Sequence, residues 1–279
     1  MRLGYNTNGL ANHDPLEAIT LLADVGYRSV ALTLDHGLLN PFANDWSLQR
    51  ARLKSTLRGC GLTSVIETGA RFLLDRRLKH EPTLVTAGVD GRHRRIGFLK
   101  RAIDAAEFLG SDCVSLWSGM VQDNAMESEV WDRLVPSLQE VVEYAQARGV
   151  SIGFEPEPGM FIDTMARFAE LQQRLGASHL KLTLDVGHLH CLGEIPIADY
   201  ITKWKSEIVN VHIEDMRAGV HEHLMFGEGD MDFPPIIAAL RQANYRGGIH
   251  VELSRHSHEG PTAALRAYDF LSPLLAGKW

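Results

Sequence analysis

Three acidic side chains and one histidine each follow directly after a short apolar run in the second half of the chain. They are Glu155, Asp185, His212 and Glu252. Three carboxylates that converge on one place repel one another, so they are stable together only with a cation among them. A ligand set of mostly oxygen with one nitrogen suits Mg²⁺, Mn²⁺, Co²⁺ or Zn²⁺. We therefore predict that one divalent metal ion binds these side chains.

The elements that must position these residues form a repeating pattern of short apolar strands and longer amphipathic helices. Glycine closes several of the expected helices before the next strand, for example Gly26, Gly110 and Gly176. Eight such units in residues 1–279 are typical of an α/β fold, the (β/α)8 TIM barrel, as a single domain. A doubly wound sheet is the competing fold, but the chain has no GxGxxG or GxxxxGKS phosphate loop. In a TIM barrel, active residues lie at the carboxyl ends of strands, where the predicted ligands also lie.

The expected strands are short and nearly continuous in apolar character, as buried parallel strands are. They are Leu3–Thr7, Ser29–Leu34, Thr63–Glu67, Asp112–Trp117, Ser151–Glu155, Leu180–Asp185, Ile208–His212 and Ile249–Leu253. The expected helices are Leu16–Val25, Leu48–Arg58, Ile96–Leu109, Val130–Arg148, Met165–Leu175, Ile197–Lys205, Phe233–Ala243 and Thr262–Leu275.

One expected connection is much longer than the others, because the third strand should end near Glu67 and the next helix should begin near Ile96. This loop, at about residues 69–95, is basic, with seven Lys or Arg against three Asp or Glu. A loop of this length inside a compact domain is usually functional or mobile. It is either a solvated loop or a lid that attracts an anionic substrate, in which case Arg76 and Arg77 would aid substrate binding.

The overall charge argues against binding to anionic polymers. The chain has 28 Lys and Arg against 35 Asp and Glu, a net charge of −7, so a nucleic-acid partner is not expected. The three cysteines are far apart and indicate reduced thiols. No long apolar segment predicts a leader peptide or membrane span, so we expect a cytoplasmic protein. Assembly into a homo-oligomer is left open.

The predicted ligands resemble the metal-binding quartet of the xylose isomerase-like barrel superfamily. That superfamily includes ketose 3-epimerases, hydroxypyruvate isomerase, inosose-processing enzymes and family-2 apurinic endonucleases. The resemblance covers nearly the whole chain and is most specific in LDVGH at 184–188, VHIEDMR at 211–217 and FGEGDMDFPPIIAAL at 226–240. It implies a divalent ion at the quartet and a paired acid and base at Glu155 and Glu252. It also implies that His188 and Arg217 contact substrate oxygens.

Such a site would suit proton transfer next to a carbonyl group. A metal that chelates the carbonyl and a neighbouring hydroxyl spreads the developing charge, while two carboxylates remove and return the proton. We therefore predict a metal-dependent isomerase or epimerase that acts on a sugar or related hydroxy-carbonyl compound through a metal-stabilised enediolate. A small sugar-like substrate is expected, and an anionic one is compatible with the basic loop. Further candidates to contact it are Glu157, His221, His223 and Trp117.

Other reactions on the same metal remain open. The resemblance to the endonucleases aligns His188, His221 and His223 with the ligands of another ion, so a second metal there is an alternative to substrate contact. The endonucleases also need histidines after strands three and four, where this chain has Glu67 and Trp117. A hydrolase, including endonuclease-like phosphodiester cleavage, a dehydratase or lyase, and a non-catalytic relative are the alternatives. Phe at position 161, where the ketose epimerases carry Glu, argues against close identity with them.

Overall fold

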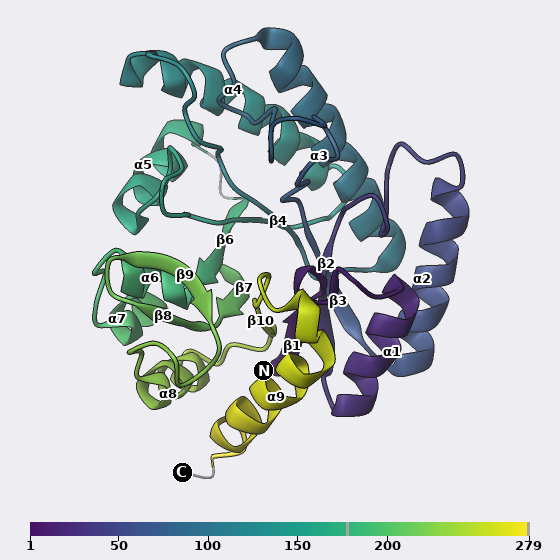
Figure 1. Ribbon diagram of the computed structural model, residues 1–279. Coiled ribbons are helices and arrows are strands. Elements are labelled where there is room, and N and C mark those ends of the chain that lie inside the picture. Colours follow the sequence, from purple (N-terminus) through teal and green to yellow (C-terminus); the bar gives the residue numbers. More distant parts are fainter. Residues whose placement is uncertain (177–178, 278–279) are drawn as a thin grey trace.

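The computed structural model describes residues 1–176 and 179–277 and confirms the predicted (β/α)8 barrel (Figure 1). Eight parallel strands close in the order β1-β10-β7-β6-β5-β4-β3-β2, and Leu3 pairs with Ile249 where the first and last strands meet. The barrel strands are β1 (Arg2–Asn6), β2 (Ser29–Thr33), β3 (Thr63–Glu67), β4 (Val114–Leu116), β5 (Ile152–Phe154), β6 (Leu180–Asp185), β7 (Ile208–Ile213) and β10 (Gly248–Val251).

Helices surround the barrel, and α9 runs beside the N-terminal strand (Figure 1). They are α1 (Pro15–Val25), α2 (Trp46–Cys60), α3 (Val89–Leu109), α4 (Glu127–Gln146), α5 (Met165–Leu175), α6 (Val186–Cys191), α7 (Ile197–Trp204), α8 (Phe233–Gln242) and α9 (Gly260–Leu275), with short 3₁₀ turns η1 (Thr7–Leu10) and η2 (Ser257–Glu259). Within the described ranges, every helix is too short or too polar to cross a membrane.

Helix α6 was not expected from the sequence, and two further differences affect the elements around the pocket. Helix α3 begins at Val89 rather than near Ile96, so the connection after β3 is shorter than 69–95 and three of its arginines belong to the helix. The apolar run at Ile96 starts only after two largely polar turns, which hid the true start. The segment expected to be a loop after β7 is a hairpin of β8 (Asp215–Arg217) and β9 (Val220–Leu224).

Two apolar layers hold the barrel together. The larger one lies between strands and helices, where Phe168 packs on both Phe154 and Trp204. A separate small cluster contains Ala31 and Val65. Because side chains alternate along a strand, these residues share the barrel-facing side with Thr33 and Glu67, which line the pocket at the mouth. Polar side chains therefore follow this apolar cluster at the carboxyl end of the barrel.

Small residues make room for polar groups inside the barrel. A Cβ atom added to Gly4 in β1 would lie 2.3 Å from His250 Cδ2 and 3.1 Å from Ser29 Cβ. The His250 ring is fully buried and hydrogen-bonded on both nitrogens, so it cannot move aside without losing a bond. Glycine at position 4 is therefore a packing requirement.

We expect Gly4→Ala to destabilise the protein by about 1–3 kcal/mol, the usual cost of overpacking a core. The matched control is Gly97→Ala on α3, where an added Cβ meets nothing within 4 Å. That variant should be more stable by about 0.5–1 kcal/mol, because alanine favours the helix. Urea unfolding midpoints measure both changes, and equal effects of the two substitutions would contradict this account of the barrel interior.

Candidate functional site

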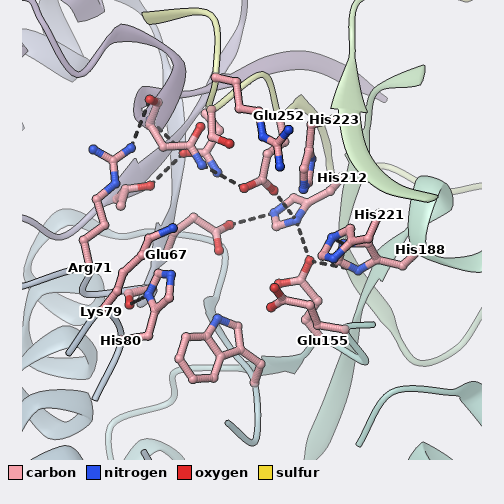
Figure 2. A pocket seen from close by; sticks show the side chains of 18 residues that line it. Glu67, Arg71, Lys79, His80, Glu155, His188, His212, His221, His223 and Glu252 are labelled. Carbon is pink, nitrogen blue, oxygen red and sulfur yellow. Dashed lines mark hydrogen bonds and ion pairs between the residues drawn. The ribbon is translucent and has the colours of Figure 1, made fainter. Parts of the chain in front are cut away.

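A polar pocket opens at the carboxyl ends of the barrel strands (Figure 2). Its cavity measures about 250 Å³, below the range of roughly 300–1,000 Å³ for drug-sized ligands, so it suits a small molecule. Every predicted metal ligand except Asp185 lines it directly, and Asp185 lies beneath them with its side chain fully buried. The pocket is therefore where the predicted site residues meet.

The structure brings the predicted quartet together around one imidazole. Ligand atoms of Glu155, Asp185, His212 and Glu252 all lie within 4.8 Å of one another. His212 Nδ1 lies 2.9 Å from Glu155 Oε1, 3.0 Å from Glu252 Oε2 and 4.0 Å from Asp185 Oδ2. Asn8 fixes Glu252 from the other side by donating to Oε1 at 2.7 Å. Asp185 Oδ2 is buried without a hydrogen-bond partner, as a carboxylate oxygen reserved for a cation would be.

The buried surroundings shift the pKa values of these side chains in different directions. Burial alone would lower the pKa of His212, but the surrounding carboxylates outweigh it and raise that pKa well above its usual value. Burial raises the pKa of Glu155 strongly. Burial also opposes ionisation of Glu252, yet the adjacent His212 imidazolium holds the pKa of Glu252 below its ordinary value. A positive charge therefore already sits among the carboxylates in the metal-free protein, carried by His212.

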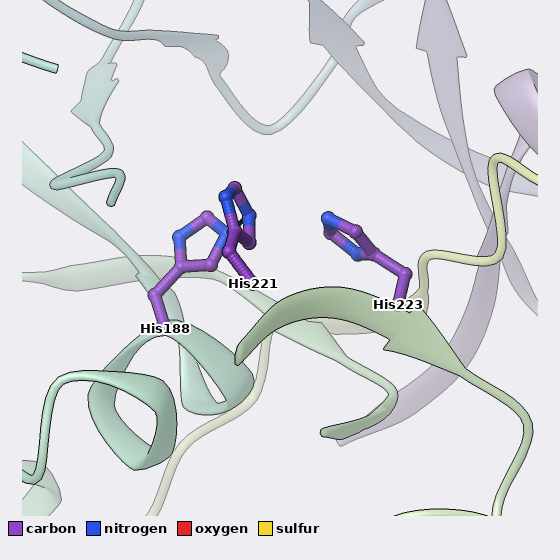
Figure 3. A group of neighbouring side chains, drawn as sticks. All are labelled: His188, His221 and His223. Carbon is purple, nitrogen blue, oxygen red and sulfur yellow. Dashed lines mark hydrogen bonds between the residues drawn. The ribbon is translucent and has the colours of Figure 1, made fainter. Parts of the chain in front are cut away.

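Three further histidines form a second group beside the quartet (Figure 3). His188 comes from α6, and His221 and His223 come from β9. His188 Nδ1 donates to Pro156 O at 3.1 Å, and its Nε2 lies 3.1 Å from Nε2 of His221. Burial lowers the pKa of His188 to about 4 and lowers that of His221. These two rings are therefore neutral and already hydrogen-bonded to each other.

His223 differs from its neighbours because a buried carboxylate stands behind it. Its Nδ1 lies 3.7 Å from Glu214 Oε2, and Glu214 is fully buried. Burial would lower the pKa of His223, but the nearby carboxylate of Glu214 raises it to about 10. Burial raises the pKa of Glu214 to about 8. Gly187 makes this position available, because a Cβ there would lie 1.9 Å from Glu214 Oε1.

The opposite wall of the pocket carries cationic and aromatic side chains (Figure 2). Arg71 donates to Asn8 O at 3.1 Å and lies 3.4 Å from Asp35 Oδ2. Lys79 is exposed at the pocket edge, and no carboxylate of the described chain lies within 4.0 Å of its ammonium. Behind the wall, the buried guanidinium of Arg95 lies 4.6 Å from the Trp117 ring centroid.

Most of the predicted substrate contacts lie in this pocket, and one does not. Those that line it are Trp117, Glu157, His188, His221 and His223. Arg217 is exposed and lies outside the pocket lining. Its side chain shares the face of Asp215 in β8, and both bind the following loop: Arg217 donates to Glu228 O at 2.9 Å, and Asp215 accepts from Gly227 N at 2.8 Å. The structure places Arg217 outside this lining, and its contact with substrate stays a prediction.

Sequence reasoning missed part of the lining. Glu67 ends strand β3 in the same way as the quartet residues end theirs, so the same strand-end rule could have found it. Asn8 and Ser254 had no comparable signal, because polar residues just after a strand are common in every barrel. Lys79 belonged to the predicted basic loop, but nothing in the sequence separated it from Arg76 and Arg77, which are exposed and do not line the pocket.

Comparison with known proteins identifies relatives of this chain. A family model described as xylose isomerase-like TIM barrel matches residues 19–274. The L-ribulose-5-phosphate 3-epimerase UlaE of Shigella flexneri is 24% identical over 264 residues, covering 94% of this chain and 90% of UlaE.

Solved structures show the same fold. A structure of L-ribulose 3-epimerase superposes with a TM-score of 0.80 at 20% identity, covering 99% of this chain and 95% of that one. A structure of IOLI protein with a bound zinc atom superposes with a TM-score of 0.79 at 18% identity, covering 100% and 99%. At these identities the likeness establishes the fold alone.

We expect a divalent cation to stabilise the wild-type protein through the quartet. Mn²⁺ at about 100 times its dissociation constant should add roughly 2.7 kcal/mol of stability. Asp185→Asn should abolish most of that gain, because the amide keeps the hydrogen bond from His188 N but loses the charge. Glu222→Gln, which alters an exposed carboxylate paired with Arg255, should keep it. Thermal unfolding with and without Mn²⁺ measures the gain, and an undiminished gain in Asp185→Asn would rule out the quartet.

Proposed function

Because the chain belongs to the xylose isomerase-like TIM barrel family, we propose that it is a divalent-metal-dependent isomerase or epimerase. Its proposed substrate is a sugar or a related hydroxy-carbonyl compound. The observation that carries the proposal is the convergence of two buried carboxylates, a third that is partly exposed, and one imidazole from the last four barrel strands. The names of two similar proteins, L-ribulose-5-phosphate 3-epimerase UlaE and L-ribulose 3-epimerase, support the same reaction class.

The quartet fits a divalent cation. Its donor set is rich in oxygen with one nitrogen, and the unpartnered Asp185 Oδ2 faces its neighbours from below. Mn²⁺, Mg²⁺, Co²⁺ and Zn²⁺ are the proposed candidates, and the zinc-bound neighbour in the same fold is compatible with this range. When bound, such an ion supplies a Lewis acid that offsets negative charge developing on substrate oxygens.

The protein's own carboxylates would move the proton. Glu155 and Glu252 both reach His212 Nδ1 but come from strands on different sides of it, β5 and β10. A substrate held between them would present one face of its carbon to each, so that one carboxylate removes the proton and the other returns one. Asn8 holds Glu252 in place through the 2.7 Å hydrogen bond. His188 and Glu157 line the same space and would bind substrate hydroxyls.

The three-histidine group has two proposed uses. We favour substrate contact for His188, His221 and His223, because two of these rings already satisfy each other by a hydrogen bond. A second metal ion is the other use, since the three rings offer ligand atoms within 4.8 Å of one another. Phosphodiester cleavage, which would draw on such an ion, is the less favoured function because β3 and β4 end in Glu67 and Trp117 instead of histidine.

We propose that the substrate carries a negative charge at the end away from the quartet. Arg71 and Lys79 line that part of the pocket, opposite the carboxylates, and Arg255 lines the pocket on the side of the β8–β9 hairpin. Arg71 and Arg255 have carboxylate neighbours, Asp35 and Glu222, whereas Lys79 has none within 4.0 Å among the described residues. A phosphate or carboxylate group of the substrate would supply the missing partner. The 24%-identical UlaE is named for a phosphorylated ketose, which agrees with this class.

We expect Glu155→Gln and Glu252→Gln each to abolish turnover while keeping the fold. Each amide retains the shape of the side chain but cannot accept a proton from carbon. The measurement is incorporation of solvent deuterium at the substrate carbon in the presence of Mn²⁺, over a panel of free and phosphorylated ketoses. A near-normal exchange rate in either variant would show that the paired-carboxylate mechanism is wrong. Loss of water from the substrate would indicate a dehydratase instead.

The anionic-substrate proposal makes a separate prediction for Lys79. Lys79→Met should raise KM for a phosphorylated ketose about tenfold, the order expected when one exposed charge-assisted contact is lost, with little change in kcat. KM for the corresponding free ketose should stay constant. Arg76→Ala and Arg77→Ala are matched controls from the same segment that lie outside the pocket lining. If the two control substitutions raised KM as much as Lys79→Met does, the charge of the whole basic segment, and not a specific contact with Lys79, would attract the substrate.

A further inference from the structure

A continuous line of buried polar groups runs inside the barrel from its lower end to the quartet. Ser29 Oγ lies 2.9 Å from His250 Nε2, and His250 Nδ1 lies 2.8 Å from Asn210 Oδ1. Asn210 Nδ2 lies 3.1 Å from Glu67 Oε1, which in turn lies 2.9 Å from His212 Nε2. All five residues are at most 6% exposed. None of these groups except His212 belongs to the proposed metal-binding set.

The glycines around His250 show that the barrel is built to hold this line. A Cβ on Gly4 would lie 2.3 Å from His250 Cδ2, and one on Gly248 would lie 2.3 Å from His250 Cε1. Glycine in two strands, β1 and β10, therefore leaves the space that the His250 imidazole occupies. A buried imidazole costs free energy unless both ring nitrogens are hydrogen-bonded, and here Ser29 and Asn210 satisfy them.

The donors and acceptors along the line can be assigned in one direction. The amide oxygen of Asn210 only accepts, so His250 Nδ1 carries the hydrogen and His250 Nε2 accepts from the Ser29 hydroxyl. Burial lowers the pKa of His250 well below its usual value, which agrees with a neutral ring of this kind. The Asn210 amide group then points its hydrogens towards Glu67.

At the upper end, Glu67 determines which nitrogen of His212 carries hydrogen. A carboxylate oxygen 2.9 Å from His212 Nε2 requires an N–H at that nitrogen, because otherwise two acceptors would be in contact. The amide nitrogen of Asn210 lies 3.1 Å from the same His212 nitrogen and shares the Glu67 acceptor with it. Nδ1, the nitrogen that faces Glu155 and Glu252, is then the one whose proton a bound metal would replace, which would leave its lone pair for the metal.

We propose that Glu67, anchored by Asn210, is a positioning residue that fixes the ring orientation and tautomer of His212 so that Nδ1 binds the metal. This inference rests on the proposed function, because it assigns a supporting role to a residue outside the quartet. A carboxylate that accepts the second N–H of a metal-binding histidine both orients the ring and raises its basicity. Glu67 lies on the Nε2 side of the ring and so cannot replace a quartet ligand.

The test is Co²⁺ binding to the purified full-length chain. Glu67→Gln keeps the side-chain shape but removes the charge, so the dissociation constant for Co²⁺ should rise about 10–100-fold and the visible d–d spectrum should change. The control is Tyr27→Phe, which deletes a buried 2.8 Å hydrogen bond to Ala264 O elsewhere in the molecule. That variant should lose stability and keep the wild-type Co²⁺ affinity and spectrum.

A second measurement needs no substitution. In histidine-labelled wild-type protein with Zn²⁺ bound, long-range ¹H–¹⁵N spectra should show the His212 hydrogen on Nε2. A hydrogen on Nδ1 would overturn the inference, as would wild-type affinity and spectrum in Glu67→Gln. In both cases the wild-type protein would still bind metal, so the proposed function would survive. A wild-type protein that binds no Co²⁺ or Zn²⁺ would overturn the proposed function and this inference together.

Discussion

The mouth of the barrel is organised by the need to balance several buried carboxylates around one imidazole. Glu67, Glu155 and Glu252 all lie within 3.0 Å of a nitrogen of His212, and Asp185 lies just beyond them. Charges taken out of water are tolerated only when they are paired and hydrogen-bonded. In the metal-free protein the His212 imidazolium meets part of this need. Under the proposed function, a divalent ion takes the place of the Nδ1 proton, since only the deprotonated nitrogen can bind a metal.

The rest of the mouth keeps those charges in place. Closure of the parallel sheet sets the ends of β5, β6, β7 and β10 around one rim, although these strands are far apart in the sequence. Beyond β7, Asp215 accepts backbone N–H bonds from Gly227 and Gly229 and so fixes the loop behind the β8–β9 hairpin. That hairpin carries His221 and His223 to the quartet. The quartet's side of the pocket is therefore assembled from strands and a paired hairpin, as a site with precise geometry requires.

The sequence was sufficient to predict which side chains lie together where the barrel topology alone determines their position. Glu155, Asp185, His212 and Glu252 could be grouped because carboxyl ends of parallel strands must meet in a closed barrel. Where local pairing decides position, the sequence was less informative. Arg217 lies on the β8–β9 hairpin and donates to Glu228 O, which no motif indicated. Helix α3 begins at Val89, inside a polar stretch that lacks a helical hydrophobic period. Glu67 went unrecognised for another reason. In the sequence, Glu67 is notable only because the endonucleases carry a histidine at that point. Its hydrogen-bond partner, His212, is 145 residues away in the sequence.

The pocket has opposite charges at its two ends, and this polarity would give a substrate one orientation. Carboxylates and the proposed cation occupy one end, whereas Arg71 and Lys79 stand at the other. Trp117 lines the same pocket, and its ring centroid lies 4.6 Å from the buried guanidinium of Arg95. A hydroxy-carbonyl compound with a distal anionic group would then place its carbonyl at the quartet, because the reverse orientation would set its negative charge against Glu155 and Glu252. Repulsion at one end therefore contributes as much to selectivity as attraction at the other.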